Sequence, residues 1–387
     1  MKLDQLQKEF IQAQVVLKRL QSEGFEAYFV GGSVRDALLG RPIHDIDIAT
    51  SAYPEEVKHV FKKTFDLGIE HGTVLVLSGK QQYEVTTFRT ESKYTDYRRP
   101  DKVKFVSDLT EDLKRRDFTV NAFAMTVDGE IIDVFDALSD LENKILRAVG
   151  KAEERFNEDA LRIMRGMRFA ADLDFDIEDE TFEAMKSHAK LLPKISIERI
   201  FVELEKLMLS PNWRKGLRTL NQSEAFKYLP GFEELDLNDF SEDYQFKSSE
   251  QAWALLYLKF HTFDLKAWKV SNDFNKKTKL IVKAYYEKAW TLENIYSYGL
   301  EIAQLADDLK FGQGLELDLS IPQNIYDLLQ IHSKSEILVK GADLIKEGHP
   351  PGPSLGQLLN KIELNIVNNK LKNQKEEILA YVKTISC

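Results

Sequence analysis

Two aspartates separated by one residue are the side chains best suited to chemistry in this sequence. Asp45 and Asp47 alternate with Ile46 and Ile48, a pattern typical of a strand with one polar and one buried face. On such a strand the two carboxylates point the same way and repel each other unless a cation lies between them. Oxygen ligands suit Mg²⁺. The pair therefore predicts a catalytic metal site with Asp45 and Asp47 as ligands.

A glycine turn lies shortly before this pair. Gly31 and Gly32 follow an apolar run at 27–30 and precede Arg35. Glycine allows backbone N–H groups to come close to a phosphate, and the start of a helix adds partial positive charge there. Arg35, in the first turn of that helix, could reach the same anion. A Gly-Gly sequence alone is more often an ordinary tight turn, but beside a metal-binding pair it predicts the phosphate cradle that nucleotidyl transfer requires.

Two further interpretations concern neighbouring residues. His44 with Asp45 could be the metal-binding doublet of a phosphohydrolase, although the additional His and Asp that such a site needs are not evident elsewhere. Glu84, on the second strand of a predicted hairpin, could complete a set of three carboxylates or could be an exposed strand residue. The sequence leaves the role of Glu84 open.

A charged run at 115–122, RRDFTVNA, is a candidate edge of a nucleotide site. The guanidinium groups of Arg115 and Arg116 match phosphate oxygens, and a carboxylate such as that of Asp117 can accept a hydrogen bond from a ribose hydroxyl. A dense charged run is usually a solvated helix surface. This one follows a basic loop and precedes an apolar stretch, which favours a pocket edge.

A second charged run lies in a helix predicted at 155–173. Glu158 and Asp159 precede Arg162 by four and three residues, so the three lie on neighbouring ridges. Arg165 and Arg168 continue the row. An ordinary helix with surface salt bridges would have the same pattern. Alternatively, Asp159 as acceptor and Arg162 as donor, held by Glu158, could present a hydrogen-bonding edge to a nucleobase. Arg165 and Arg168 could then reach the triphosphate.

Length and composition predict a globular protein of two or more domains. A chain of 387 residues is too long for one ordinary core, and 43% hydrophobic and 30% charged residues are typical of soluble proteins. No run approaches the ~20 apolar residues of a membrane span, and the first residues lack the apolar core of a signal peptide. The one cysteine is Cys387, so disulfides play no part. We expect a cytoplasmic protein without a membrane partner.

The net charge of −10 argues against a general polyanion binder. One segment departs from this balance, because residues 259–288 contain eight lysines against three acidic residues, with Trp268 and Tyr286 among the interspersed aromatics. Such a surface could contact an RNA backbone. The lysines could equally form a solvated helix face with the rings turned inward.

Periodicity predicts mixed α/β structure for about the first 145 residues and helices afterwards. An amphipathic helix begins at Leu3 and stops near Gly24, and Ser33 is expected to cap a helix that ends before Gly40. Pro54 suits the first turn of a further helix. The other expected elements are strands at 27–30, 45–48, 73–77, 83–88 and 130–135, a basic loop at 90–103, and helices at 155–173, 182–192, 195–209, 355–367 and 373–385.

Taken together, these motifs resemble the class II tRNA nucleotidyltransferase and poly(A) polymerase family of the polymerase-β-like superfamily. The likeness runs in order through GGSVRDALLG, DID, RRDFTVNA and EDALRIMRGMRFA, and continues with KISIER at 194–199. The segment GPSLG at 352–356 resembles the bacterial CCA-adding branch. The resemblance covers nearly the whole chain.

The resemblance implies an α+β fold with a polymerase-β-like head, built from a mixed sheet with helices, followed by an all-helical neck, body and tail. It implies a catalytic head at 1–146, a base-recognising neck at 147–200, a body at 201–300 and a tRNA-binding tail at 301–387. The implied activity is template-independent addition of C, C and A to the 3′ end of tRNA from CTP and ATP, with Mg²⁺. A poly(A) polymerase or an A-adding enzyme of the same family is the alternative.

The resemblance also implies roles for individual residues. Asp45 and Asp47 would be the catalytic metal ligands. Arg98 and Arg99 fall in the region of the family's flexible loop, whose full length here argues against an enzyme that adds only C. The oligomeric state, monomer or homodimer, stays open. The implied nucleotide-binding residues are Gly32, Arg35, Arg116, Asp159, Arg162, Arg165 and Arg168.

Overall fold

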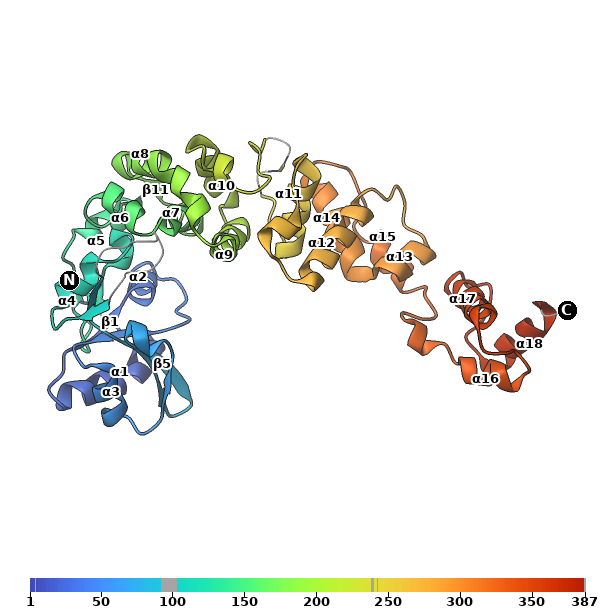
Figure 1. Cartoon of the computed structure of the whole chain (residues 1–387), viewed down its shortest axis with the longest axis horizontal. Helices are drawn as coiled ribbons and strands as arrows, with labels where there is room; N and C mark the ends of the chain where they lie inside the picture. Colours follow the sequence, from blue (N-terminus) through green and yellow to red (C-terminus); the bar gives the residue numbers. More distant parts are fainter. Residues whose placement is uncertain (4, 92–102, 238–239, 242, 386–387) are drawn as a thin grey trace. The chain divides into compact units, whose positions relative to one another are not determined.

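The computed structural model describes residues 1–3, 5–91, 103–237, 240–241 and 243–385 (Figure 1). The chain forms two compact units, Met1–Leu235 and Asp236–Cys387. Across the described ranges, every helix is too short or too polar to cross a membrane.

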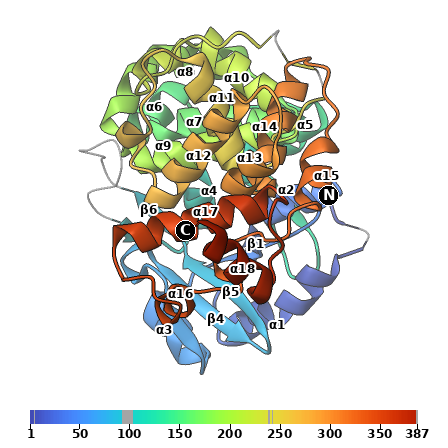
Figure 2. The same cartoon turned by 90° about the vertical axis from the view of Figure 1, so that its right-hand side faces the viewer.

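A mixed seven-stranded sheet forms the centre of the first unit. Its strand order is β3-β4-β5-β2-β1-β8-β9. Strand β2 runs parallel to β5, and the remaining pairs are antiparallel. Figure 2 shows β4 and β5, the hairpin predicted from the sequence. The strands are β1 Ala27–Val30, β2 Asp47–Thr50, β3 Thr64–Asp66, β4 Thr73–Ser78, β5 Gln81–Thr87, β8 Ala124–Met125 and β9 Ile131–Ile132.

Two short ribbons complete the strands of this unit. Strand β6 (Arg89–Glu91) pairs antiparallel with β7 (Val103–Phe105). Strand β10 (Ile145–Leu146) pairs parallel with β11 (Asp176–Ile177), which follows the first long helix of the neck region. The β10–β11 pair therefore joins the end of the α/β part to the helical part of the same unit.

Short helices surround the sheet. Helix α1 (Lys8–Ser22) buries the predicted apolar stripe, including Phe10, Leu17 and Leu20, but starts later than the sequence pattern indicated. Helix α3 (Pro54–Val60) has Pro54 in its first turn, as expected. The other helical segments here are α2 Gly32–Leu38, η1 Ile69–His71, α4 Leu109–Lys114, η2 Thr119–Asn121 and α5 Ala137–Glu142.

The remainder of the first unit is helical, with one correction to the expected pattern. The helix predicted at 155–173 is two helices, α6 (Ala152–Glu158) and α7 (Leu161–Leu173), because Asp159 has an extended backbone with φ −138° and ψ 103°. Helix α7 packs against α9 and α10. The following elements are α8 Asp179–His188, η3 Ala189–Lys194, α9 Ile197–Met208, α10 Trp213–Gln222 and η4 Ala225–Tyr228.

One glycine brings α7 close to the sheet-bearing part. A Cβ at Gly166 would overlap the Met185 side chain and lie 2.8 Å from Cζ of Phe118. Phe118 is fully buried. Since a larger residue does not fit here, Gly166 allows α7 to pack directly beside the segment that carries RRDFTVNA.

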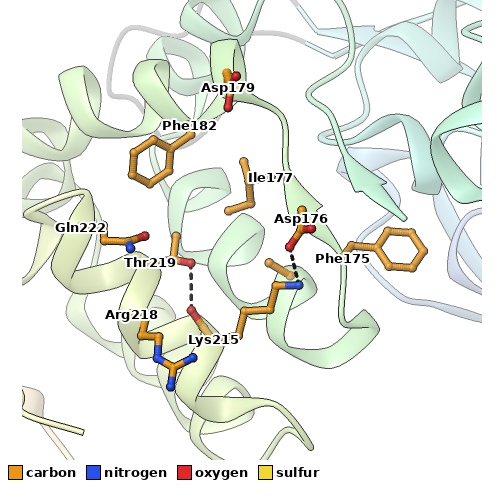
Figure 3. A pocket seen from close by; sticks show the side chains of 10 residues that line it. Phe175, Asp176, Ile177, Asp179, Phe182, Lys215, Arg218, Thr219 and Gln222 are labelled. Carbon is orange, nitrogen blue, oxygen red and sulfur yellow. Dashed lines mark hydrogen bonds and ion pairs between the residues drawn. The ribbon is translucent and has the colours of Figure 1, made fainter. Parts of the chain in front are cut away.

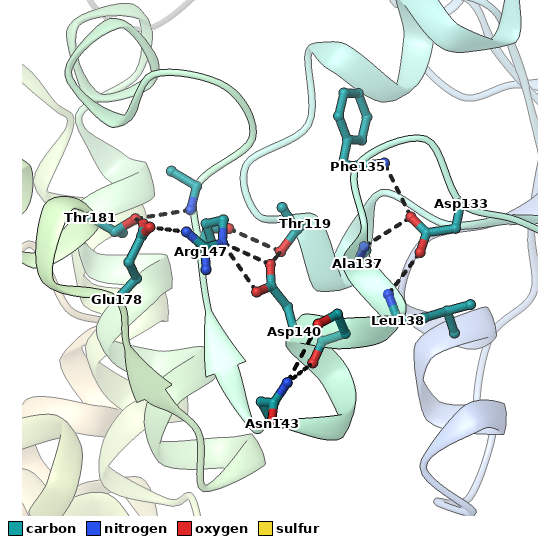
Figure 4. A network of polar contacts seen from close by, with 12 residues as sticks. Thr119, Asp133, Phe135, Ala137, Leu138, Asp140, Asn143, Arg147, Glu178 and Thr181 are labelled. Atoms are coloured by element: carbon teal, nitrogen blue, oxygen red, sulfur yellow. Dashed lines mark hydrogen bonds and ion pairs between the residues drawn. The ribbon is translucent and has the colours of Figure 1, made fainter.

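A buried polar network fixes the same segment from the other side (Figure 4). Thr119 Oγ1 donates to Asp140 Oδ2 over 2.7 Å, and Arg147 Nε donates to the same carboxylate over 3.1 Å. Arg147 also pairs with Glu178, which accepts a hydrogen bond from Thr181. The η2 turn is therefore tied to α5, β10 and α8.

The second unit is helical in its described part, as the sequence predicts. Its last three helices, α16, α17 and α18, are drawn in red (Figures 1 and 2). Leu344 of α16, Ile362 and Ile366 of α17 and Ile378 of α18 belong to one apolar core. The elements are α11 Ser249–Lys259, η5 Leu265–Trp268, α12 Asn272–Tyr285, α13 Leu292–Tyr298, α14 Leu300–Gly312, α15 Ile321–Tyr326, η6 Lys334–Glu336, α16 Gly341–Lys346, α17 Pro353–Val367 and α18 Lys375–Ile385.

The lysine-rich segment of this unit combines both interpretations given above. Trp268 is buried, with its ring centroid 4.8 Å from that of Trp253, so this aromatic belongs to the core. Tyr286 is 70% exposed. Lys277 pairs with Glu250 and Glu301. Of these two rings, one is thus turned inward and the other lies at the surface, and contact of this segment with RNA stays a prediction.

Candidate active site

The aspartate pair lies where β2 enters the middle of the sheet. Strand β2 begins at Asp47, so Asp45 lies two residues before it and outside the strand that was expected at 45–48. Ile46 is 7% exposed and Ile48 is fully buried, which confirms the alternation predicted for this segment. Burial of the two isoleucines therefore fixes Asp47 on the polar face.

Glu84 lies beside Asp47. The two residues are partners in the parallel register of β2 and β5, so their side chains share a face of the sheet. Desolvation raises the pKa of Asp47 to about 6, the negative charges of Glu84 and Asp45 act in the same direction, and Arg116 opposes them. A cation placed here would relieve that repulsion.

A preformed cage of three or more His, Cys, Asp or Glu side chains around a metal position is absent from the described residues. The doublet of His44 and Asp45 therefore gains no further His or Asp among them, and the phosphohydrolase interpretation has no support there. Glu84 acts on Asp47 through its charge. Two carboxylates with open positions fit Mg²⁺, which usually keeps several waters and binds substrate phosphates.

The glycine turn differs in detail from the sequence expectation. Gly31 has φ 73° and precedes α2, which begins at Gly32. Ser33 lies inside the helix, and its hydroxyl donates to the carbonyl of Val30 over 3.1 Å, so Ser33 is not the cap. A Cβ at Gly31 would lie 3.0 Å from Nη1 of Arg116 and 3.6 Å from Oδ2 of Asp47. Gly31 therefore allows the backbone to come close to both groups.

Arg116 lies between two acidic groups. Its Nη2 donates to Asp112 over 3.4 Å and its Nη1 donates to the carbonyl of Asn121 over 3.3 Å. Asp112 is buried and also accepts a hydrogen bond from Arg115 Nε over 2.9 Å. Arg116 thus stands beside Asp47 but has partners of its own.

A continuous polar chain links the glycine turn to the neck helix α7. Arg35 Nη1 donates to Asn121 Oδ1 over 2.5 Å, and Asn121 Nδ2 donates to Asp117 Oδ1 over 3.1 Å. Asp117 Oδ2 then pairs with Arg165 Nη2 over 2.6 Å. Burial alone would raise the pKa of Asp117, but Arg165 and the hydrogen bond from Asn121 hold it at about 2.

Ion pairs hold Arg162 and Asp159, the two residues predicted to read the base. One of these contacts differs from the sequence expectation. Arg162 Nη1 pairs with Glu158 over 2.7 Å, as predicted, and its Nη2 donates to the carbonyl of Arg115 over 2.9 Å. Asp159 lies in the break between α6 and α7, and its Oδ2 pairs with Arg199 of α9 over 2.7 Å. The extended backbone at Asp159 turns this carboxylate toward α9, which a continuous helix would not do.

Glu203 of α9 joins the remaining two arginines. It pairs with Arg168 over 2.5 Å and with Arg165 over 3.6 Å, and it is only 6% exposed. Each predicted arginine of the site therefore has an acidic partner in the described structure. These guanidinium groups are held in place before any ligand binds.

Sequence reasoning missed several of the residues that hold the predicted ones. Asp112, Asn121, Arg199 and Glu203 all contact a predicted site residue. Asn121 and Arg199 lie within segments already recognised as motifs, RRDFTVNA and KISIER. Asp112 and Glu203 lie one turn from such motifs, on the same helical face. Arg98 and Arg99 fall outside the described residues.

A separate cavity of about 360 Å³ lies between α7, β11, α8 and α10 (Figure 3). Phe175, Phe182, Lys215 and Arg218 are among the residues lining it, and Lys215 pairs there with Asp176 over 2.7 Å. It contains none of the predicted site residues. The candidate active site is therefore the polar region between β2, α2, η2 and the start of α7.

Comparison with known proteins decides the family. A family model described as the poly A polymerase head domain matches residues 27–147. A CCA-adding enzyme of Lactococcus lactis subsp. cremoris is 59% identical, with 99% of this chain and 98% of the relative covered. The chain belongs to the CCA-adding enzyme family.

Further matches cover the remainder of this family member. Residues 174–235 match a model described as a probable RNA and SrmB-binding site of polymerase A, and residues 244–382 match a putative tRNA nucleotidyltransferase domain 2. A CCA-adding enzyme of Streptococcus thermophilus is 54% identical over 100% of this chain and 99% of the relative. The chain is a nucleotidyltransferase with a polymerase-β-like head.

A solved structure agrees with the fold of this CCA-adding family member. The Bacillus stearothermophilus CCA-adding enzyme in complex with CTP has a TM-score of 0.89 and 38% identity, with 98% of each chain covered. This agreement confirms the predicted fold class, a mixed-sheet head followed by helical parts.

Proposed function

We propose that this enzyme adds C, C and A to the 3′ end of tRNA, using CTP and ATP and no nucleic-acid template. The observation that carries the proposal is the polar chain from Arg35 through Asn121 and Asp117 to Arg165, set beside Asp47. It joins the turn predicted to bind phosphate to the helix predicted to read the base, and Gly31 of that turn lies close to Asp47. Relatives named CCA-adding enzymes, matched over the full chain, support the same reaction.

The reaction is a nucleotidyl transfer. The 3′-hydroxyl oxygen of the tRNA attacks the α-phosphorus of CTP or ATP and forms a new phosphodiester bond. The bond from the α-phosphorus to the bridging oxygen breaks, and pyrophosphate leaves with that electron pair. Covalent attachment to the enzyme is not needed, because acceptor and donor are both held next to the aspartate pair.

We propose Mg²⁺ as the metal and Asp45 and Asp47 as the residues that hold it. When bound, it lowers the pKa of the attacking hydroxyl and stabilises charge on the phosphorus centre and on the leaving pyrophosphate. The donor set fits this ion, because the carboxylate oxygens repel each other and Asp47 has a raised pKa in its absence.

We propose that the arginines divide the nucleotide between them. Gly32 and Arg35 at the glycine turn, with Arg116, whose charge acts on Asp47, would bind the phosphates. Asp159 and Arg162 would read the base, since one accepts and the other donates hydrogen bonds. Arg165 and Arg168, held by Asp117 and Glu203, would complete the cationic wall around the nucleotide.

The proposed division of labour along the chain follows the motifs. The head at 1–146 carries the chemistry, the neck at 147–200 reads the base, and the body at 201–300 and tail at 301–387 hold the tRNA. Double-stranded RNA is bound mainly through its shape and backbone, so a few lysines suffice despite the net charge of −10. We place the enzyme in the cytoplasm, where its substrates are available.

One incubation tests the proposal. The protein is given tRNA that lacks its 3′ end, Mg²⁺, and labelled CTP or ATP, separately and together. Addition of C, C and A that then stops supports it, whereas a long A tail would support a poly(A) polymerase and no product would refute both. Asp45→Ala is the matched inactive variant, and unchanged incorporation by it would refute the metal assignment.

A further inference from the structure

We propose that Asn121 is a positioning residue whose side-chain amide fixes Arg35 and Asp117 at a set separation within the nucleotide site. The inference rests on the proposed function, in which Arg35 binds the phosphates of the incoming nucleotide, and on the sequence-based interpretation of Asp117 as an acceptor for its ribose hydroxyl. Asn121 itself is buried, 6% exposed, and is not expected to touch the nucleotide.

The contacts of Asn121 use both ends of its amide. Oδ1 accepts a hydrogen bond from Arg35 Nη1 over 2.5 Å, and Nδ2 donates to Asp117 Oδ1 over 3.1 Å. Its backbone carbonyl accepts a hydrogen bond from Arg116 Nη1 over 3.3 Å. Asn121 is thus in contact with Arg35 of α2 and with Arg116, which follows α4. It also contacts Asp117, whose carboxylate pairs with Arg165 of α7.

The chemistry of the two partners leaves one orientation for the amide. A guanidinium can only donate hydrogen bonds, and an ionised carboxylate can only accept them. Asp117 is ionised, because Arg165 and Asn121 hold its pKa at about 2 in spite of its burial. An asparagine can meet both demands at once, whereas an aspartate of the same shape would turn its second oxygen toward another carboxylate.

The backbone at Asn121 is held firmly enough for this task. Its N–H donates to the carbonyl of Phe118 over 3.0 Å within η2, and Phe118 is packed against Gly166 of α7. Thr119 is fixed by Asp140 and by the carbonyl of Arg147 (Figure 4). A rigid turn with a singly oriented amide is a suitable spacer between two ligand-binding groups.

The partners are also held from their far sides. Arg35 pairs with Asp36 over 2.9 Å, and Asp117 pairs with Arg165 over 2.6 Å. Without the amide, Arg35 would keep Asp36, and Asp117 would keep Arg165 and the backbone N–H of Phe118, but the link between Arg35 and Asp117 through Asn121 would be lost. Removal of the amide should therefore weaken binding of the sugar and phosphates of the nucleotide and leave base selection unaffected.

The test compares Asn121→Asp, Asn121→Ala and the control Asn143→Ala. Asn143 is exposed on the surface of the same unit, and its amide donates to the carbonyl of Ser139 over 2.8 Å (Figure 4). The kcat and KM for CTP, for ATP and for 2′-deoxy-CTP are measured with tRNA lacking its 3′ end, together with thermal unfolding.

For Asn121→Asp we expect kcat/KM to fall by about 10-fold to 100-fold for CTP and ATP alike, because the amide that donates to Asp117 is replaced by a carboxylate that repels it. The preference for CTP over 2′-deoxy-CTP should fall in both Asn121 variants, since Asp117 is no longer directed at the ribose. A residue that served folding alone would change the unfolding temperature without changing the sugar preference. Asn143→Ala should match the wild type throughout.

A double-mutant cycle keeps the inference testable if Asn121→Asp does not fold. Asn121→Ala and Arg35→Ala are combined, and a combined loss clearly smaller than the product of the single losses is expected if Asn121 acts through Arg35. Fully multiplicative losses, or Asn121 variants that keep the wild-type sugar preference, would overturn the inference. If the wild type itself adds no nucleotides, the proposed function fails instead, and the two failures are therefore distinguishable.

Discussion

Asp47 on β2 and Glu84 on β5 are partners in a parallel register, which places two carboxylates on the same face of adjacent strands. Desolvation and the charge of Glu84 raise the pKa of Asp47 to about 6. Ionisation of Asp47 is therefore less favourable in the folded protein than in a solvated chain. The candidate active site thus concentrates negative charge at a cost to stability, as is common where function requires it.

The first prediction concerns the pH dependence of that cost. Because the folded pKa of Asp47 lies above its ordinary value of 3.8, its protonated form is favoured by folding. The contribution of Asp47 to the free energy of unfolding is therefore present at low pH and is lost as the pH rises through about 6. In EDTA, Asp47→Asn should therefore unfold at a higher temperature than the wild type at pH 8, and the difference should shrink toward pH 5.

Calorimetry or circular dichroism at several pH values measures this difference. Glu26→Gln is the control, because Glu26 is exposed and lies directly before β1. This variant should follow the wild type at every pH. A pH-independent difference between Asp47→Asn and the wild type would mean that the ionisation of Asp47 is not the cause.

The second prediction separates two roles for Glu84. If Glu84 acts on Asp47 only through its charge, Glu84→Gln should keep nucleotide incorporation within about 10-fold of the wild type, since two carboxylates suffice for Mg²⁺ with waters and phosphates. Asp47→Asn should lose at least 10²-fold by comparison, as expected for loss of a metal ligand. The acid limb of the Glu84→Gln pH profile should move to lower pH.

Single-turnover incorporation of CTP at several Mg²⁺ concentrations measures both variants. Should Glu84→Gln be as inactive as Asp47→Asn, with a much higher Mg²⁺ requirement, Glu84 would be a third ligand of the metal.

The third prediction concerns Gly31, whose φ of 73° is unfavourable for a residue with a Cβ. Gly24, with φ 88° and nothing within 4 Å of its Cβ position, offers a matched control. Both Gly→Ala changes should destabilise the fold by about 1–3 kcal/mol. Gly31→Ala should in addition lower kcat/KM about 10²-fold, because its methyl group would displace Arg116 from the carboxylate pair.

Kinetics at saturating tRNA, together with urea unfolding, distinguish the two effects. Equal activities of the Gly24→Ala and Gly31→Ala enzymes would mean that the glycine turn is needed only for its backbone conformation.

The local parts of the site were predictable from the sequence for a physical reason. The alternation of Asp45, Ile46, Asp47 and Ile48 reports which face of the strand is buried, and it does so without knowledge of the fold. The hairpin and the proline at the start of α3 are equally local signals. Glycine and carboxylate motifs therefore gave the correct elements, although the exact cap before α2 was wrong.

The break between α6 and α7 was not predictable in the same way. Buried residues continue at helical spacing from Phe156 through Ile163, so the apolar pattern gives no sign of an extended residue at Asp159. Part of the cause is tertiary, because Asp159 accepts a hydrogen bond from Arg199, 40 residues away, in addition to the local one from the backbone of Leu161. The pairing of Asp117 with Arg165, 48 residues apart, escapes local periodicity in the same way.

The last prediction concerns this tertiary contact. Arg199 is the ion-pair partner of Asp159, with Nη2 and Oδ2 separated by 2.7 Å. Arg199→Ala would leave Asp159 Oδ2 without its ion pair, and only the hydrogen bond from the backbone of Leu161 to Oδ1 would still hold the carboxylate, so the acceptor of the base-reading edge would be less firmly fixed. We expect the preference between CTP and ATP to fall by about 10-fold. The affinity for the metal should change less. Arg162→Ala should have the same signature because it removes the donor of that edge.

Competition between labelled CTP and ATP at a fixed tRNA end measures the preference directly. Lys151→Ala removes a cation whose ion pair with Glu154 is exposed, and it should leave the preference unchanged. Arg199→Lys keeps the charge but not the two-nitrogen geometry, so it should recover part of the selectivity. If Arg199→Ala folds and selects nucleotides as the wild type does, Asp159 reads the base without help from α9, and the helix break must serve folding alone.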